Sequence, residues 1–307
     1  MTGSLPSVSV VIPALRGGDA LIHAVESVER QTFGEISEIV IASPNDMPSE
    51  LEDRVTWIDN PTGTTPEGLN RGIAASTGEV IVRCDAHAIL PPSYVASAVN
   101  TLVSTGAANV GGMQVPVGTG FWSSAIAAAM SSPLGAGDAR YRVGGTPGPA
   151  ETVYLGTFNR QDLDEVGGFD PEFVRNQDFE LNHRLIQAGK TVWFDPELQV
   201  TYRPRNSLRA LARQYFDFGR GKRRFARVHP GQLLVRQMAP TALVIALASS
   251  VLLGLVWRPM WLVPAGYVIG LVAGGLATIP KAGLAAAGVP LALATMHISW
   301  GLGFIRG

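Results

Sequence analysis

The chain has 307 residues, of which 46% are hydrophobic and 16% are charged, and it contains one cysteine, Cys84. This composition excludes a disordered chain, a disulfide framework and a zinc site built from several thiolates, and it favours an intracellular setting. The net charge of −1 conceals an uneven distribution that excludes a uniform soluble globule, because residues 1–202 hold 24 acidic and 11 basic side chains whereas residues 203–307 hold 13 basic side chains and one acid.

The first part of the chain predicts strands that alternate with helices. Runs of β-branched residues indicate strands, and apolar residues at helical spacing indicate helices. The expected strands cover residues 7–13, 38–43, 55–59 and 79–83, and the expected helices cover residues 19–31 and 66–75. This alternation predicts an α/β fold with a mostly parallel sheet, whose ligands bind beyond the carboxyl ends of the strands.

Polar residues follow these strand ends, and Asp85 and His87 are the most informative of them. If the segment is extended, both side chains project to the same face. A carboxylate with an imidazole suits Mn²⁺, and a carboxylate alone suits Mg²⁺ that bridges to phosphate. The alternative is an ordinary turn in which the aspartate bonds to the backbone.

A second polar cluster opens a predicted helix at residues 176–184. Asp178 lies in its first turn, where the helix dipole favours an ionised carboxylate, and this placement suits a general base. The alternative is a stabilising acid at a helix start, with Glu180 and Arg184 forming an ordinary i,i+4 pair.

The glycine-rich segment 135–149 predicts a long mobile loop, a candidate lid. The glycines match neither a P-loop nor a dinucleotide-binding fingerprint. No nucleophile elbow or His-Glu-x-x-His motif occurs, so hydrolase and zinc-protease functions have no support.

Residues 206–236 are predicted to form a basic amphipathic helix at a membrane interface. The positive-inside rule then places this segment and the preceding domain, residues 1–205, in the cytoplasm, which agrees with an N-terminus that lacks a secretory signal. Nucleic-acid binding by the same cations is disfavoured by the hydrophobic sequence that follows.

The C-terminal region, residues 237–307, contains three apolar stretches at 238–257, 260–279 and 282–305. Each is long enough to cross a bilayer core, which needs about 20 helical residues. We expect about three transmembrane helices; the alternatives are a buried helical core or re-entrant hairpins.

Several segments together resemble the family 2 glycosyltransferases of GT-A fold, over about residues 7–205. The segments are SVVIPAL at 9–15, IVIASPND at 39–46, TPEGLNRGIAASTGEVIVRCDAH at 65–87, YLGTFNRQDLDEVGGFD at 154–170 and NQDFELNHRL at 176–185. The hydrophobic C-terminal region is similar to that of bacterial exopolysaccharide glycosyltransferases of the succinoglycan-synthesis type. The resemblance implies a GT-A sheet with helices on both faces.

The resemblance also implies inverting transfer from a nucleotide-diphosphate sugar, with a UDP-sugar favoured over a GDP-sugar and with Mn²⁺ or Mg²⁺ as cofactor. Asp85 matches the first acid of the family's Asp-x-Asp metal motif, and His87 replaces the second. Asp178 matches the catalytic base of a Glu-Asp pair in which Gln177 replaces the glutamate.

Further site residues follow from the same resemblance. Ser43 stands where an acid often contacts the nucleoside, so that role passes to Asp46 or is lost. The expected donor-binding residues are Pro13, Ala14, Ser43, Asp46, Asn70, Arg71, Arg83 and Asp85, and the expected acceptor-side residues are Gln177, Glu180 and Arg184. The alternative for Arg71 and Arg83 is a role in surface ion pairs.

The predicted function is sugar transfer to a lipid-linked acceptor at the cytoplasmic membrane face, in polysaccharide or glycolipid synthesis, by a multi-pass protein whose catalytic domain lies in the cytoplasm. One alternative is a polyprenyl-phosphate sugar synthase, whose phosphate nucleophile needs no base. An alternative of another class is a catalytically inactive membrane scaffold or lipid-binding protein. Processive polymerisation is disfavoured because no Gln-x-x-Arg-Trp motif is present.

Overall fold

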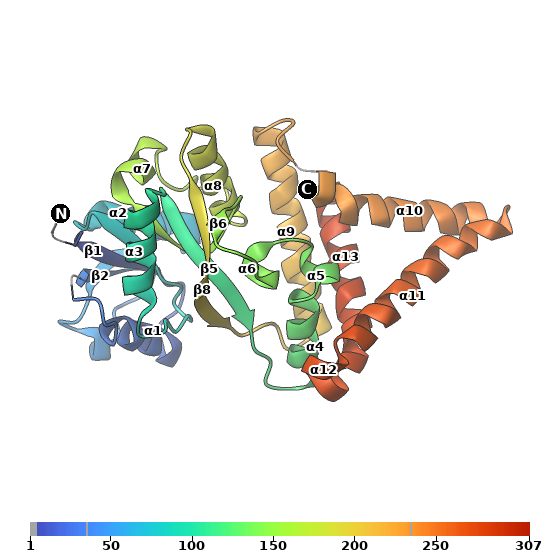
Figure 1. The fold of residues 1–307 in the computed structure, drawn as a ribbon, viewed down its shortest axis with the longest axis horizontal. Coiled ribbons are helices and arrows are strands. Elements are labelled where there is room, and N and C mark those ends of the chain that lie inside the picture. Colours follow the sequence, from blue (N-terminus) through green and yellow to red (C-terminus); the bar gives the residue numbers. More distant parts are fainter. Residues whose placement is uncertain (1–4, 35, 234) are drawn as a thin grey trace. The chain divides into compact units, whose positions relative to one another are not determined.

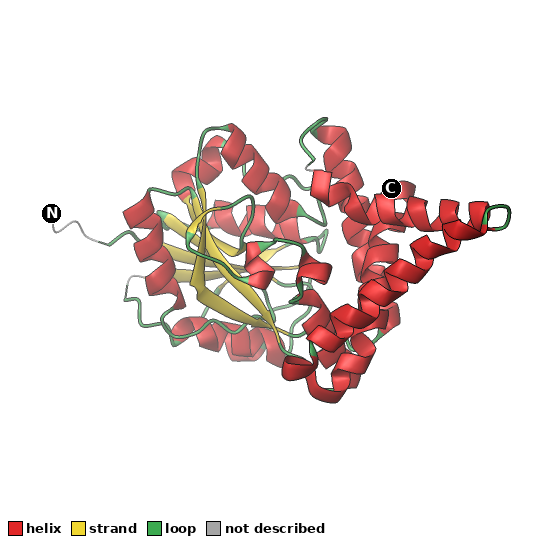
Figure 2. Cartoon of the chain, turned by 45° about the vertical axis from the view of Figure 1, so that its right-hand side comes forward, coloured by secondary structure: helices red, strands yellow, loops and turns green. Residues whose placement is uncertain are grey.

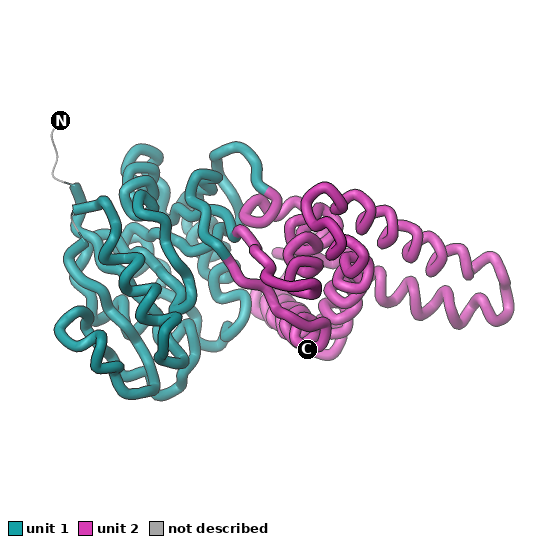
Figure 3. Tube along the Cα trace, turned by 90° about the horizontal axis from the view of Figure 1, so that it is seen from below, with its two compact units in different colours: residues 1–114, 144–201 teal, residues 115–143, 202–307 magenta. Residues whose placement is uncertain are grey.

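The computed structural model describes residues 5–34, 36–233 and 235–307 (Figure 1). The chain forms two compact units, which are residues 1–114 with 144–201 (unit 1) and residues 115–143 with 202–307 (unit 2) (Figure 3). The sequence-based division at residue 205 differs in two segments, because residues 115–143 and 202–205 belong with the C-terminal helices. Unit 1 is an α/β structure and unit 2 is helical (Figure 2).

The sheet has eight strands in the order β3-β2-β1-β4-β7-β5-β8-β6. The strands are β1 (Val8–Pro13), β2 (Ile36–Ser43), β3 (Thr56–Asp59), β4 (Val80–Arg83), β5 (Asn109–Pro116), β6 (Gly148–Pro149), β7 (Tyr154–Asn159) and β8 (Val192–Tyr202). Strands β1 to β4 are parallel, and β7 is antiparallel to both β4 and β5. The first four strands match the predicted ranges to within two residues, because β-branched runs flanked by turns leave little choice of structure.

Helices cover both faces of the sheet in unit 1, as expected. The helices of this unit are α1 (Asp19–Glu29), α2 (Thr65–Ala75), α3 (Tyr94–Thr105), α7 (Arg160–Glu165) and α8 (Gln177–Gln187), with a 3₁₀ turn, η1 (Ser49–Leu51). Val10 and Ile12 of β1 belong to the buried cluster that includes residues of α1 and α3. The intervening Val11 faces α2, where a Cβ at Gly72 would lie 2.5 Å from Val11 Cγ1. Alternation along β1 therefore gives each layer of helices its own apolar surface.

Unit 2 consists of helices. They are α4 (Phe121–Met130), α5 (Pro133–Ala136), α6 (Arg140–Val143), α9 (Leu208–Val228), α10 (Ala239–Gly254), α11 (Leu262–Ala277), α12 (Ile279–Ala282) and α13 (Val289–Arg306), with 3₁₀ turns η2 (Val235–Met238), η3 (Arg258–Trp261) and η4 (Gly283–Gly288). Helix α10 runs out to a turn, from which α11 returns (Figure 1). Helices α9 and α13 pack closely through glycines, since a Cβ at Gly303 would lie 2.1 Å from Phe216 O.

The segment 135–149 is not the long structureless loop that its glycines predict. It contains the end of α5, helix α6 and strand β6, which pairs with β8. The Ser132 Oγ accepts a hydrogen bond of 3.1 Å from Gly135 N, and Pro133 occupies the first turn of α5. These local start signals outweigh the flexibility that the glycines introduce.

Within the part of the chain that the structure describes, three helices are long and apolar enough to span a membrane by length and composition. They cover Val235–Gly254, Arg258–Ala277 and Ile279–Arg306, close to the predicted stretches. The third is composite, because η4 separates α12 from α13.

Candidate functional site

The two carboxylates that are predicted to act in catalysis, Asp85 and Asp178, both pair with the buried guanidinium of Arg83. Arg83 ends β4, and its side chain is 6% exposed. Its Nε donates to Asp85 Oδ1 over 2.9 Å, and its Nη2 lies 2.8 Å from the same oxygen. Its Nη1 pairs with Asp178 Oδ1. The fold thereby joins the end of β4 to the start of α8.

Local backbone geometry directs Asp178 to this position. Asn176 precedes α8 with a φ of 62°, a left-handed conformation that asparagine tolerates better than most residues. Asp178 then lies in the first turn of α8, as predicted. Its side chain is 37% exposed, compared with 17% for Asp85, so Asp178 is the more accessible of the two acids.

The electrostatics of the cluster keep Arg83 charged and raise the pKa of Asp178 above its ordinary value. Desolvation raises the pKa of Asp178, and the nearby Asp85 raises it further, while Arg83 opposes both effects; the net direction is upward. Burial by itself would lower the pKa of Arg83, but the Asp178 and Asp85 carboxylates hold it above its ordinary value. Arg83 therefore stays charged and keeps the two acids together.

The segment after Asp85 is a turn, which is the alternative that the sequence left open to an extended segment. Ala88 N donates to Asp85 O over 2.8 Å, which closes the turn, and His87 is exposed. The same-face argument for Asp85 and His87 consequently does not apply, although the two residues remain close in sequence.

The carboxylate oxygens at this site suit a divalent cation whose remaining ligands come from a phosphate. Within the described ranges, no group of three or more His, Cys, Asp or Glu residues is arranged to hold a metal. Mg²⁺ and related ions are commonly held by one or two carboxylates together with substrate phosphates. Both Arg83 contacts to Asp85 use Oδ1, so Oδ2 is the oxygen that a cation would meet.

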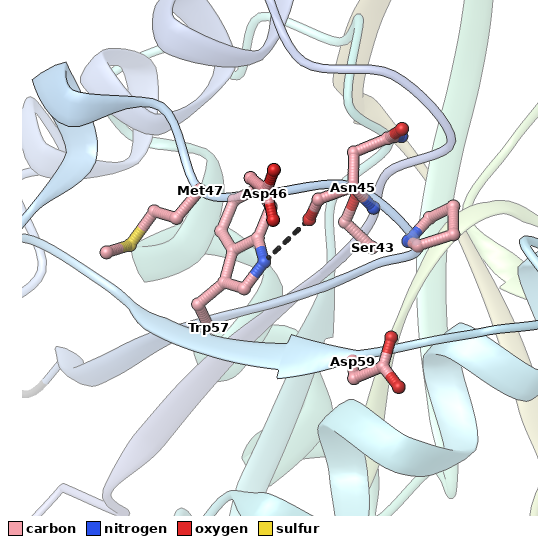
Figure 4. Close-up of a pocket in the computed structure, with 7 residues that line it drawn as sticks. Ser43, Asn45, Asp46, Met47, Trp57 and Asp59 are labelled. Atoms are coloured by element: carbon pink, nitrogen blue, oxygen red, sulfur yellow. Dashed lines mark hydrogen bonds between the residues drawn. The ribbon is translucent and has the colours of Figure 1, made fainter.

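A cavity of about 300 Å³ lies at the carboxyl ends of β2 and β3 (Figure 4). Its lining comprises Ser43, Pro44, Asn45, Asp46, Met47, Trp57 and Asp59. The Trp57 indole N–H donates to Asn45 O over 3.1 Å, and Asn45 Nδ2 donates to Leu15 O over 2.7 Å. These bonds connect the loops that follow β1 and β2 to the edge strand β3.

The cavity contains two of the predicted donor residues, Ser43 and Asp46, and five that were not among the predicted site residues. These are Pro44, Asn45, Met47, Trp57 and Asp59. Asp59 ends β3, so the rule that ligands bind beyond strand ends would have identified it. Trp57 gives a weaker signal, because a tryptophan in a short edge strand is also typical of simple packing.

Four other predicted donor residues have defined environments. Ala14 is 2% exposed and donates its N–H to Ala42 O over 2.9 Å, directly after Pro13. The Asn70 amide bonds both backbone groups of Phe169, at 2.7 and 2.9 Å, and thereby ties α2 to the segment after α7. Arg71 pairs with Glu67 at 2.9 Å, and its Nη1 lies 3.4 Å from the carbonyl oxygen of Asp59, a residue of the cavity lining.

The predicted acceptor-side residues separate into two kinds. Glu180 is 1% exposed and forms a bidentate pair with Arg184, both contacts at 2.7 Å. Arg184 Nη2 also donates to Gly168 O over 2.7 Å. This pair stabilises the start of α8, whereas Gln177 is partly exposed beside Asp178.

The family model of glycosyl transferase family 2 matches residues 9–167, about half of the chain. This range includes β1 to β4 and Asp85, though not Asp178. The chain belongs to glycosyl transferase family 2 and is a glycosyltransferase.

Two curated relatives and one solved structure extend this result. Succinoglycan biosynthesis protein ExoA of Rhizobium meliloti (strain 1021) is 30% identical over 317 residues, covering 97% of this chain and 93% of that protein. The dolichyl N-acetyl-alpha-D-glucosaminyl phosphate 3-beta-D-2,3-diacetamido-2,3-dideoxy-beta-D-glucuronosyltransferase of Methanococcus voltae is 24% identical over 194 residues, covering 61% of this chain and 59% of that protein. The mannosyltransferase PcManGT from Pyrobaculum calidifontis, solved with GDP-Man and Mn²⁺, superposes with a TM-score of 0.60 at 18% identity, covering 98% of this chain and 86% of that chain. The last likeness confirms the GT-A fold.

Proposed function

We propose that this glycosyltransferase moves a sugar, with inversion, from a nucleotide-diphosphate sugar to a lipid-linked acceptor in polysaccharide synthesis at the cytoplasmic membrane face. The main observation behind the proposal is that Asp85 and Asp178 both form ion pairs with Arg83. In this cluster Asp85 would act on the side of the leaving diphosphate, and Asp178 would act on the side of the attacking hydroxyl. The similarity to ExoA, a succinoglycan biosynthesis protein, supports the polysaccharide assignment.

The cavity at the ends of β2 and β3 is the proposed nucleoside site. Trp57 offers a flat aromatic surface to a base, and Asp46 and Asp59 offer carboxylates to ribose hydroxyls or ring N–H groups. Arg71, beside Asp59, supplies a cation for the donor phosphates. A UDP-sugar is the first donor to test, and the GDP-Man in the PcManGT complex makes GDP-sugars the second.

Asp85, with His87 close by, would hold Mn²⁺ or Mg²⁺ on the leaving-group side. When bound, such an ion neutralises the charge that develops on the departing diphosphate. The Mn²⁺ in the PcManGT complex supports this cofactor. Arg83 keeps Asp85 in place through Oδ1.

Asp178 is the proposed general base. Arg83 pairs with Asp178 Oδ1. Asp178 Oδ2 is therefore the oxygen that would accept the proton of the acceptor hydroxyl. Attack by that hydroxyl from the face opposite the diphosphate inverts the anomeric centre. Gln177, partly exposed in the same turn, is the proposed acceptor-side neighbour.

The membrane assignment rests on the three apolar helices and on the basic helix α9 before them. We assign catalysis to residues 1–205, an interfacial role to residues 206–236 and membrane anchoring to residues 237–307. The positive-inside rule would orient α9 and the catalytic domain toward the cytoplasm. The Methanococcus voltae relative is named for transfer to a dolichyl-linked sugar phosphate, which supports a lipid-linked acceptor here.

A donor screen tests the proposal. Purified full-length protein is mixed with UDP- or GDP-sugars, total bacterial membrane lipid, and either Mn²⁺, Mg²⁺ or a chelator, and the release of nucleotide diphosphate is measured. The proposal predicts release with one donor that needs both metal and lipid. Metal-independent release, or no binding of any nucleotide sugar, would contradict it.

A further inference from the structure

Unit 2 contains a half-buried arginine that has no carboxylate partner among the described residues. Arg142 lies in α6, and its Nη1 donates to the phenol oxygen of Tyr215 on α9 over 3.2 Å. Its guanidinium carbon lies 5.4 Å from the centre of the Tyr141 ring. Tyr202 also lies within electrostatic range. Two tyrosines therefore contact a permanent positive charge, and a third lies near enough to feel it.

The acids of unit 2 do not neutralise this charge. The sequence gives the unit 15 lysines and arginines and two acids, Asp138 and Asp217. Asp138 pairs with Arg236. Over the described ranges, neither acid makes an ion pair with Arg142. Burial raises the pKa of the Tyr215 phenol, so that this phenol stays neutral and supplies no counter-charge.

The neighbouring polar groups add hydrogen-bonding capacity around Arg142. Gln214 Nε2 donates to the Tyr202 phenol oxygen over 3.1 Å, while its Oε1 is buried and has no hydrogen-bond partner among the described residues. A buried polar group or charge without a partner is costly, and a bound ligand relieves that cost. A guanidinium beside phenol O–H groups is a donor set suited to phosphate oxygens.

The apolar surroundings favour a phosphate that is attached to a lipid. Tyr215 belongs to a buried cluster that also contains Ile126 and Met296, and α13 of this cluster is part of a candidate membrane span. A ligand with an anionic head and an apolar tail satisfies both features. We propose that Arg142, Tyr215, Tyr202 and Gln214 form a binding site for the phosphate or diphosphate group of the lipid-linked acceptor.

This inference rests on the proposed function and specifies the chemistry of the acceptor. A bilayer phospholipid carries the same phosphate ester, so the experiment separates the two sources. Native mass spectrometry of the full-length protein in neutral detergent measures binding of farnesyl phosphate, farnesyl diphosphate, farnesol, phosphatidylglycerol and inorganic phosphate. The site predicts that both farnesyl phosphates bind more tightly than farnesol, phosphatidylglycerol or free phosphate.

Variants assign the binding to the site. Arg142→Gln should weaken farnesyl phosphate binding by about tenfold or more, because a charge-assisted hydrogen bond is lost, whereas Arg142→Lys should retain part of it. Tyr215→Phe should weaken binding by a smaller factor. Arg258→Gln removes an exposed charge from the same unit and should leave binding unchanged. Retained binding of the nucleotide-sugar donor by each variant shows that the protein remains folded.

The outcomes distinguish this site from the proposed function. Equal binding by wild type and Arg142→Gln would overturn the site and leave lipid-dependent transfer intact. Equal affinity for phosphatidylglycerol and farnesyl phosphate would overturn the acceptor assignment. Farnesol binding as tightly as farnesyl phosphate would overturn the phosphate requirement itself.

Discussion

Replacing Arg83 with glutamine should both destabilise unit 1 and lower turnover. The change leaves Asp85 and Asp178 facing each other without the cation that separates their charges. Breaking a buried pair typically costs about 3–5 kcal/mol, and the Arg83–Asp85 pair is close to this case because the two side chains are 6% and 17% exposed. The Asp178 half is about one-third exposed, so we assign it no more than about 1 kcal/mol.

We therefore expect the free energy of unfolding to fall by about 3 kcal/mol, which for a unit of this size corresponds to a decrease in Tm of roughly 6–12 °C. Differential scanning fluorimetry of the full-length protein in detergent measures the decrease. Arg83→Lys keeps the positive charge, so its Tm should lie between that of wild type and that of Arg83→Gln. The matched control is Arg54→Gln, which breaks the exposed pair with Glu29 and should cost at most about 1 kcal/mol. A Tm for Arg83→Gln equal to that of the control would refute the reasoning.

Three further predictions concern the base, the cavity and the helix packing. Because Asp178 must be ionised to act as a base and its pKa is raised, kcat should decline on acidification at a higher pH than the ordinary value of 3.8, and a pH profile of kcat with saturating donor checks this. Trp57→Ala should raise the KM for the donor by roughly tenfold without changing kcat, since base–aromatic stacking is worth about 1–3 kcal/mol; steady-state kinetics with varied donor separates the two constants. Gly219→Ala should destabilise unit 2 by about 1–3 kcal/mol, because its Cβ would lie 2.1 Å from Trp300 O. The control Gly266→Ala places a Cβ that meets nothing within 4 Å, so it should be neutral or slightly stabilising. Thermal unfolding of both variants in the same detergent tests the contrast.

Local sequence patterns were sufficient to predict the first half of the sheet. Strands β1 to β4 are short apolar runs with helices and turns between them, so periodicity and turn residues determine their limits. The antiparallel insertion of β7 between β4 and β5 was not predictable from periodicity, because pairing between distant segments depends on tertiary contacts.

The candidate site shows the same division. Asp85 and Asp178 were identified from their positions at a strand end and a helix start, but their connection through Arg83 needed the fold. For Arg83 the sequence left two roles open, contact with donor phosphate or an ion pair, and in the fold its guanidinium pairs with both acids. Glu180 and Arg184 illustrate the converse, since an i,i+4 pair can be read from the sequence while its burial cannot.

The assignment of residues 115–143 had no local signal. Sequence composition places this segment in the acidic half, yet it packs with the C-terminal helices through Ala125, Ile126 and Met130. Alanine-rich helices bury equally well in either unit, so the partner is decided by shape and not by composition.

The most direct test of the central claim compares Asp178→Asn with wild type. Once a donor and a lipid acceptor are known, the release of nucleotide diphosphate measures transfer, and isothermal titration of the donor with Mn²⁺ measures binding. We predict that transfer is lost while metal-dependent donor binding persists. Turnover equal to wild type would contradict the role of Asp178 as the base and would instead favour a phosphate nucleophile, as in a polyprenyl-phosphate sugar synthase.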